Sequence, residues 1–177
     1  MNPTNAIRAK FKRNARAVAI VPESVHRTAV TEVRLDEGLR CEIEEGPWKI
    51  IADMSERWGG GSAGPNPGVL GRGALGSCLA MNIVTWAAVE EIEVRSIRIQ
   101  VEADYDARGI SRPQDFAPGY EQVRLQVLIE SPAAEAEVRR LMTFVEQATA
   151  YIDTFRRPMD VQVRTEIVKS AGAEAAA

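Results

Sequence analysis

The stretch GPNPGVLGRGALGSCLAMNI, Gly64–Ile83, decides how this chain folds. Asn66 followed by Pro67 predicts a helix start, because an Asn side chain caps free amides and a first-turn proline needs no hydrogen-bond acceptor. After Pro67, from Val69 to Glu91, apolar or small side chains occur on nearly every face, which predicts a buried central helix. Three glycines on this helix are spaced so that another backbone could approach closely: Gly71, Gly73 and Gly76.

The segment before this helix, Gly59–Gly68, is the sharpest composition change in the chain, rich in Gly and Pro. Glycine-rich loops before helices often cradle phosphates. This one has neither the lysine of a P-loop nor a buried strand followed by GxGxxG. We interpret it as a loop without a nucleotide site.

Alternation of apolar and polar residues predicts strands on both sides of the helix. Before it, turns join three short segments that predict a three-stranded antiparallel sheet: Thr28–Leu35, Arg40–Ile43 and Trp48–Asp53. After it, Val94–Tyr105 alternates strictly and Val123–Ile129 follows beyond a loop, which predicts a second antiparallel sheet.

The last third of the chain predicts one more helix and one more strand. Ser131 followed by Pro132 resembles a helix start, and an apolar stripe then predicts an amphipathic helix: Val138, Leu141, Met142, Val145 and Ile152. Alternation over Asp160–Lys169 predicts a final strand. The fold class is α+β, with a basic N-terminal arm at 1–26, one domain at 27–169 and a frayed Ala-rich tail at 170–177.

Composition limits the kinds of partner. The 177 residues are 45% hydrophobic and suit one globular domain. With 22 basic and 25 acidic side chains the net charge is −3, so no nucleic-acid partner is expected over the whole surface. The basic N-terminal arm, acid-free before Glu23, leaves a local basic contact open, although a solvated arm is the simpler interpretation.

The sequence predicts a cytoplasmic protein with no membrane segment. The longest apolar stretch, Ala74–Val89, falls short of the roughly 20 residues that a spanning helix needs. The apolar run Ala15–Val21 contains Arg16 and ends before Pro22, unlike a secretory signal. Two cysteines are too few for a disulfide scaffold, which favours a reducing compartment. An organelle transit peptide stays open as the less favoured alternative.

Few residues in the chain can carry chemistry. One histidine, His26, and two cysteines cannot form a Cys/His zinc site, so we expect no metal and no cofactor. Cys78 on the central helix is the candidate nucleophile, but a free thiol is mostly protonated at neutral pH. Cys78 lies about three turns into the helix, beyond the strong field of the helix dipole, so a cation must come from elsewhere. The alternative is a small apolar side chain packed beside Leu75 and Leu79.

The NP…ALGSC string around Cys78 resembles the OsmC/Ohr family, the osmotically induced protein C and organic hydroperoxide resistance proteins. The resemblance covers roughly Thr28 to Val168. It implies an α+β OsmC-like fold in which two chains intertwine into a homodimer, with active sites near the subunit interface. It also implies thiol-dependent reduction of organic hydroperoxides at Cys78, with an activating arginine from the first hairpin, Arg34 or Arg40.

Two positions depart from the family's peroxidase pattern. Gly68 stands where a glutamate usually follows the NP pair, and Thr149 stands where a second, resolving cysteine usually lies. A sulfenic acid at Cys78 would then need an external thiol reductant. Cys41 is the only internal substitute, although simple packing beside Ile43 is the favoured interpretation.

Three residues are candidates for the pocket: Trp58, Thr149 and Tyr151. The first hypothesis is a peroxidase acting through Cys78 with an external reductant. The alternative is a non-catalytic dimer of the same fold that binds a small apolar ligand.

Overall fold

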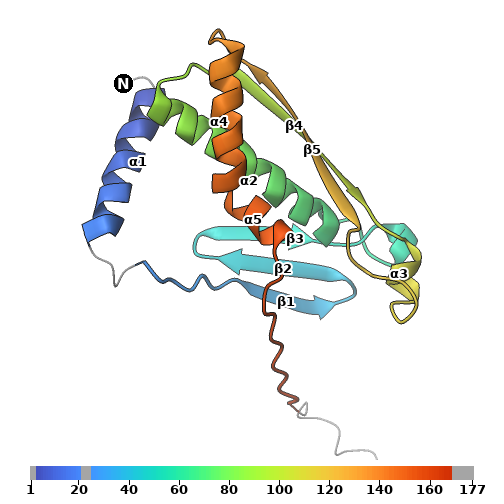
Figure 1. Cartoon of the computed structure of the whole chain (residues 1–177). Helices are drawn as coiled ribbons and strands as arrows, with labels where there is room; N and C mark the ends of the chain where they lie inside the picture. Colours follow the sequence, from blue (N-terminus) through green and yellow to red (C-terminus); the bar gives the residue numbers. More distant parts are fainter. Residues whose placement is uncertain (1–2, 21–24, 169–177) are drawn as a thin grey trace, which may run out of the picture.

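The computed structural model describes residues 3–20 and 25–168. Its elements, in chain order, are α1 (Pro3–Ile20), β1 (Glu32–Glu37), β2 (Arg40–Glu45), β3 (Trp48–Ala52), the 3-10 turn η2 (Glu56–Trp58), α2 (Pro67–Glu90), β4 (Ser96–Asp104), α3 (Arg108–Ser111), β5 (Gln122–Glu130), α4 (Glu135–Ala148) and α5 (Ala150–Arg156). Figure 1 shows α2 running diagonally through the centre, with α4 crossing it, the β4–β5 ribbon along one side and β1–β3 beneath.

The N-terminal sheet is antiparallel in the order β1-β2-β3, as predicted. Its two turns place Gly38 and Gly46 at φ of 59° and 53°, where glycine carries no steric penalty. The first strand starts at Glu32, so the predicted start at Thr28 is wrong: residues 28–31 form no strand pairing in the described chain.

The start of α2 is confirmed. The Asn66 side chain accepts a hydrogen bond from the Val69 amide at 3.1 Å, and Pro67 is the first helical residue. Leu75, Leu79 and Ile83 form the centre of the core, each 2% exposed or less. By length and composition α2 could cross a membrane, but these buried side chains make it the core helix of an α+β domain.

Burial of α2 is one-sided. Val69, Met81 and Val84 are 45%, 68% and 37% exposed on its other side. Added Cβ atoms at Gly71 and Gly73 would meet nothing within 4 Å, so no backbone approaches there within one chain. At Gly76 an added Cβ would lie 3.1 Å from Val101 of β4, and here glycine does permit close packing.

The second sheet is the predicted antiparallel ribbon of β4 and β5, with Ile97 opposite Ile129 and Val101 opposite Leu125. Its apolar residues face the helices and pack beside the core. Because side chains alternate along a strand, the other face of the ribbon carries polar residues and the exposed Leu128.

The second helical region begins later than predicted. Ser131 does not cap it: the Ser131 hydroxyl donates to the Glu93 carbonyl and accepts from the Ala133 amide, which ties the segment to the start of β4. The helix begins at Glu135, where the Glu137 carboxylate accepts from the Ala134 amide at 3.3 Å. It breaks at Thr149, so α4 and α5 replace the single predicted helix.

The N-terminal segment is a helix whose first half packs on α2, so this half is not the solvated arm that the sequence predicts. Phe11 of α1 meets Trp86 of α2 edge to face with ring centroids 5.0 Å apart, and Trp86 meets Phe144 at 4.6 Å. Arg8 forms an ion pair with Glu91. This contact was not predicted, because Phe11 stands among basic residues in the sequence. Every residue from 12 to 20 is exposed, so only the first half of α1 packs on the body (Figure 1).

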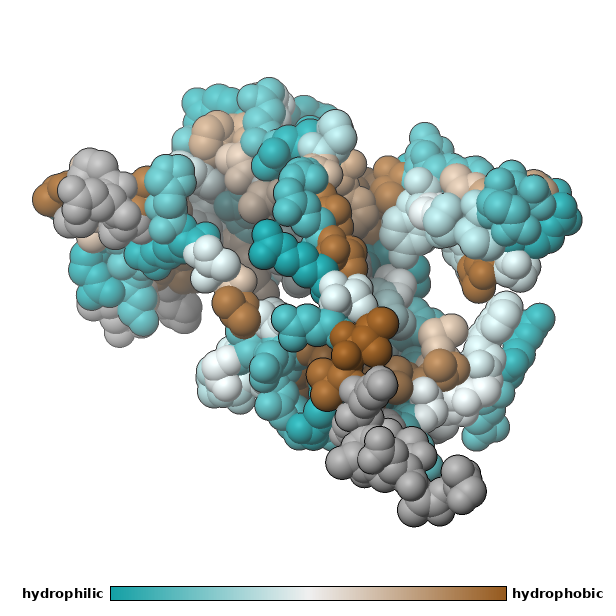
Figure 2. Space-filling model, turned by 90° about the horizontal axis from the view of Figure 1, so that it is seen from below, coloured by the Kyte–Doolittle hydropathy of each residue, from teal (hydrophilic) through white to brown (hydrophobic). Residues whose placement is uncertain are grey.

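The predicted final strand at Asp160–Lys169 is also wrong for the part that the structure describes. Residues 157–168 are extended without strand pairing, and Val161, Val163 and Ile167 are 77%, 85% and 91% exposed. A strand needs a neighbour for its ladder, and this segment has none within the described chain. Figure 2 shows brown apolar side chains gathered beside this end of the molecule. Lys169 and the predicted tail lie outside the described residues.

We expect Ile83→Ala to lower the free energy of unfolding by roughly 2–5 kcal/mol, because the side chain is 0% exposed and leaves a cavity. Leu128→Thr is the control, since Leu128 is 68% exposed on β5 and threonine suits strands; its effect should stay within about 0.5 kcal/mol. Denaturant unfolding followed by circular dichroism, at one protein concentration, measures both. Equal losses would contradict this core.

Candidate functional site

Cys78 lies on α2, half-buried, at the edge between the packed and open sides of the helix. Asn82 is one turn further along and shares its face. Within residues 3–20 and 25–168, no side chain forms a hydrogen bond or ion pair with the thiol. The described part of one chain therefore brings no cation into contact with the Cys78 thiol.

Thr149, predicted as a pocket residue, contacts Asn82, one helical turn from Cys78. It is 1% exposed. Its hydroxyl donates to the Val145 carbonyl at 2.7 Å and accepts from Asn82 Nδ2 at 2.9 Å. The break between α4 and α5 is thus fastened to α2 one turn beyond Cys78.

The two predicted arginines lie in a different place. Arg34 and Arg40 line a hollow of about 560 Å³ between the β1–β2 hairpin and the loop Gly59–Gly61. Cys78 is not among the residues that line it. The structure of one chain therefore does not bring these arginines together with the thiol.

Glu42 is the centre of charge in this hollow. Arg34, Arg40 and Lys49 reach its carboxylate at 3.4, 3.0 and 2.7 Å. The hydrogen bonds from Lys49 and then Arg40 hold the pKa of Glu42 below its ordinary value of 4.5. Glu42 was not among the residues predicted from the sequence. The available signal is that Glu42 alternates with Arg40 along β2 and lies opposite Arg34 of β1.

Asp53 is a second residue that sequence reasoning missed. It is 3% exposed, and its carboxylate accepts hydrogen bonds from the backbone amides of Met54 at 2.7 Å and of Gly61 and Ala63 at 3.0 Å each. The Ala63 bond is the largest of the influences that hold the pKa of Asp53 below 3.8. An acidic residue that ends a strand before a Gly-rich loop is the available signal.

The loop itself needs glycine where it passes β3. A Cβ at Gly60 would lie 2.0 Å from the Met54 carbonyl oxygen, and one at Gly64 would lie 2.2 Å from that of Ile51. Asp53 and these close approaches fix the path of the chain from the sheet to α2.

The remaining predicted site residues are Cys41, Trp58 and Tyr151. Cys41 pairs in register with Leu35 and Ala52 on the apolar face of the sheet and is half-buried, on the side opposite Glu42. Trp58 and Tyr151 are 53% and 44% exposed. Trp58 does not line the arginine hollow, although the loop directly after it does.

At Gly68, the space beside the glycine is occupied by other polar groups. An added Cβ would lie 3.2 Å from Arg72 Nη1 and 3.4 Å from the Tyr120 hydroxyl. In the part of the chain that the structure describes, no group of three or more His, Cys, Asp or Glu side chains could hold a metal ion.

These features define a class of α+β proteins built on one long helix. The cysteine of this helix lies close to the break between α4 and α5, which is hydrogen-bonded to the same helix. The family model for OsmC, described as OsmC-like protein, matches residues 59–164, and the chain belongs to this family.

Solved structures share the fold at low identity. An OsmC-like protein from Mycoplasma pneumoniae is 17% identical, with a TM-score of 0.64 over 75% of this chain and 89% of that one. An organic hydroperoxide resistance protein OsmC from Legionella pneumophila is 19% identical, with a TM-score of 0.56 over 75% and 92%. A putative organic hydroperoxide resistance protein from Vibrio cholerae, with captopril in one active site, is 16% identical, with a TM-score of 0.54 over 78% and 92%. The search of curated proteins finds no match.

We expect Asp53→Asn to loosen the Gly59–Ala63 loop, because the amide nitrogen of asparagine cannot accept the Gly61 and Ala63 hydrogen bonds. Hydrogen exchange at these two amides should accelerate at pH 7. Asp104→Asn, an exposed carboxylate on β4, should leave both amides unchanged.

The same variant predicts a pH dependence. The folded-state pKa of Asp53 lies below 3.8, so its stabilisation is present above that pH and is lost as pH falls through the folded-state pKa. The difference in Tm between wild type and Asp53→Asn should be constant from pH 7 to about 5 and shrink below about 4. A difference that persists undiminished at pH 2 would refute this role.

Proposed function

We propose that this protein reduces an organic hydroperoxide at Cys78 and is recycled by an external thiol. The observation that carries the proposal is the place of Cys78: half-buried on α2, one turn before the Asn82–Thr149 contact. The names of relatives with this fold, organic hydroperoxide resistance proteins, support it.

The proposed reaction balances as a two-electron reduction. The Cys78 thiolate attacks one peroxide oxygen; an S–O bond forms, the O–O bond breaks and the alcohol leaves after taking a proton. The product is a sulfenic acid. An external thiol then forms a mixed disulfide and releases water, and a second thiol restores Cys78 while the external pair becomes a disulfide.

The chain's other residues favour an external reductant. Both hydrogen-bonding roles of the Thr149 hydroxyl are filled, and it has no redox chemistry. Cys41 lies on the apolar face of a strand. We also propose a reducing, cytoplasmic compartment, because two cysteines are too few for a disulfide scaffold.

We propose a homodimer as the working form. The apolar face of the three-stranded sheet is open in one chain: Val33, Leu35 and Ile50 are 63%, 51% and 46% exposed. The extended segment 157–168 exposes another apolar row (Figure 2). Contiguous exposed apolar surface of this kind marks an interface with another chain.

A non-catalytic member of the family that binds a small apolar ligand is the second candidate. Two observations favour it: Arg34 and Arg40 are engaged by Glu42, and the described chain brings no arginine to Cys78. Peroxide consumption by the Cys78→Ser variant separates the two candidates.

Cys78→Ser should reduce thiol-dependent consumption of cumene hydroperoxide to the rate without protein, whereas Cys41→Ser should keep most of the wild-type rate. A sulfenic-acid trap followed by mass spectrometry should label Cys78 in the wild type. An unlabelled Cys78 with no turnover would favour the non-catalytic candidate. A Cys41–Cys78 disulfide would make Cys41 the resolving thiol.

Leu35→Glu should shift the protein from dimer to monomer in sedimentation equilibrium, because a carboxylate would be buried in the proposed interface. Leu128→Glu introduces the same charge on the outer face of β5 and should stay dimeric. A wild type that sediments as a monomer at all concentrations would overturn the homodimer.

A further inference from the structure

Asn82 lies one helical turn beyond Cys78 on α2, and the two side chains share a face of the helix. Side chains at this spacing have Cβ atoms about 5–6 Å apart. Because the Cα–Cβ bonds of a helix tilt toward its N-terminus, the Asn82 side chain leans over the turn that carries Cys78. The Asn82 amide is therefore a polar group beside the thiol.

Thr149 fixes the orientation of this amide. The Thr149 hydroxyl hydrogen is used in the 2.7 Å bond to the Val145 carbonyl, so the hydroxyl oxygen can only accept a bond from Asn82. The amide nitrogen of Asn82 therefore faces Thr149, at 2.9 Å. Thr149 is 1% exposed, and water does not compete for this contact. The buried hydroxyl holds the amide in one orientation.

The Asn82 amide is only partly used by the protein. It has two N–H donors and a carbonyl oxygen, and one N–H is bonded to Thr149. Within residues 3–20 and 25–168, the other N–H and the oxygen form no hydrogen bond. Since no buried polar side-chain atom in this part of the chain lacks a partner, the unpaired oxygen faces accessible space. The amide thus keeps a donor for a group that enters beside Cys78.

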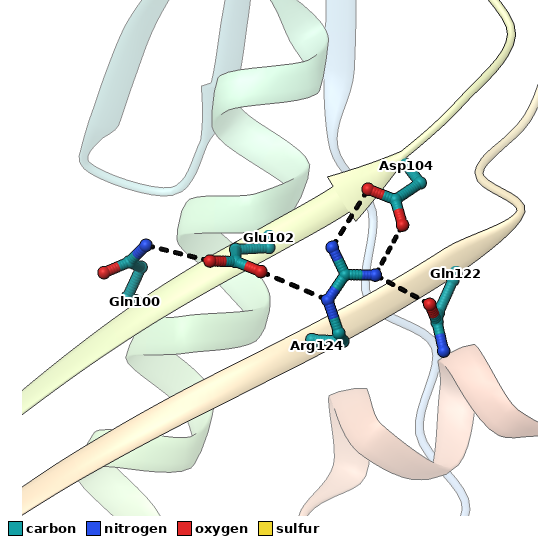
Figure 3. Close-up of polar contacts among 5 residues, drawn as sticks. All are labelled: Gln100, Glu102, Asp104, Gln122 and Arg124. Carbon is teal, nitrogen blue, oxygen red and sulfur yellow. Dashed lines mark hydrogen bonds and ion pairs between the residues drawn. The ribbon is translucent and has the colours of Figure 1, made fainter.

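Side-chain amides on the outer face of the β4–β5 ribbon are held differently. Figure 3 shows Gln100 donating to Glu102 at 3.0 Å and Gln122 accepting from Arg124 at 2.7 Å. Both glutamines are exposed, so water competes for these bonds. A group that stabilises one reacting atom needs a fixed placement, and Asn82 has it.

We propose that Asn82 is a catalytic residue of the Cys78 site, whose second N–H donates to the peroxide oxygen that leaves. Thr149 is the positioning residue that holds the amide. As the O–O bond breaks, negative charge develops on the departing oxygen, and a fixed donor stabilises this charge. The amide keeps its hydrogen, and the alcohol takes its proton from water. This role rests on the peroxidase function that we propose.

The spacing of one turn suits this role. The departing oxygen lies beyond the attacked oxygen, in line with the sulfur, so its donor must stand a few Å from the thiol. Four residues of helix rise about 6 Å. The Asn82–Thr149 contact forms within one chain and is buried at Thr149. A second chain that covers the open side of α2 therefore leaves this contact in place.

The test measures sulfenic-acid formation at Cys78 in a single turnover with cumene hydroperoxide, with a trap and mass spectrometry. Asn82→Leu should slow this step about 10- to 100-fold, the range for a hydrogen bond to a charged group. Gln100→Leu makes a matched change on the outer face of β4 and should keep the wild-type rate. Thr149→Val should slow the step less than Asn82→Leu does. Thr149→Ser, which keeps the hydroxyl, should recover most of that loss.

Two further measurements separate this role from a structural one. Alkylation of Cys78 by iodoacetamide releases iodide and no oxygen anion, so Asn82→Leu should leave the alkylation rate unchanged. The effect of Asn82→Leu should also be smaller for peracetic acid than for cumene hydroperoxide. A carboxylate is a weaker base than an alkoxide, and its departure needs less stabilisation.

The outcomes against this role are distinct. A wild-type rate of sulfenic-acid formation in Asn82→Leu would mean that the departing oxygen does not use the amide. Equal slowing of alkylation and sulfenic-acid formation would reduce Asn82 to a structural contact. A wild type that is alkylated at Cys78 but forms no sulfenic acid would overturn the peroxidase function itself, and the role of Asn82 with it.

Discussion

The packing of α2 against α4 and the β4–β5 ribbon holds the rest of the structure in place. Leu75, Leu79 and Ile83 are removed from water on that side, and burial of apolar side chains is the dominant stabilising effect in folding. The Asn82–Thr149 hydrogen bond and the Trp86 contacts with α1 and α4 fasten further elements to the same helix. The position of the Cys78 thiol is set by this packing, because Cys78 lies on the same helix.

The three-stranded sheet is attached differently. It reaches α2 through the Gly59–Gly68 loop, whose path depends on the Asp53 carboxylate and on glycines at the close approaches to β3. The sheet's apolar face stays open, and its charged face gathers Arg34, Arg40 and Lys49 around Glu42. Within one chain, Arg34 and Arg40 therefore line a hollow that does not include Cys78. In the homodimer that we propose, a second chain would cover the open apolar face of the sheet.

The two sides of α2 differ in one chain. Leu75, Leu79 and Ile83 are buried against the neighbouring elements, whereas Val69, Met81 and Val84 are exposed on the other side. A helix that looks uniformly apolar in sequence thus presents two distinct surfaces.

The sequence by itself determined the local elements. The Asn66–Pro67 start, the strict alternation of β4 and β5 and the turns at Gly38 and Gly46 follow from capping, periodicity and backbone sterics, which act between near neighbours. The string around Cys78 identified the family and the candidate nucleophile. These are short-range signals. The structure agrees with the predicted elements, and the family model agrees with the family.

Only the tertiary structure decided the rest. The helix α1 packs through Phe11 on a tryptophan 75 residues away, Ser131 is taken by Glu93 instead of capping a helix, and the 157–168 alternation finds no strand to pair with. The physical reason is common to all three: each depends on which groups far apart in the sequence come into contact, and those contacts form only when the chain folds.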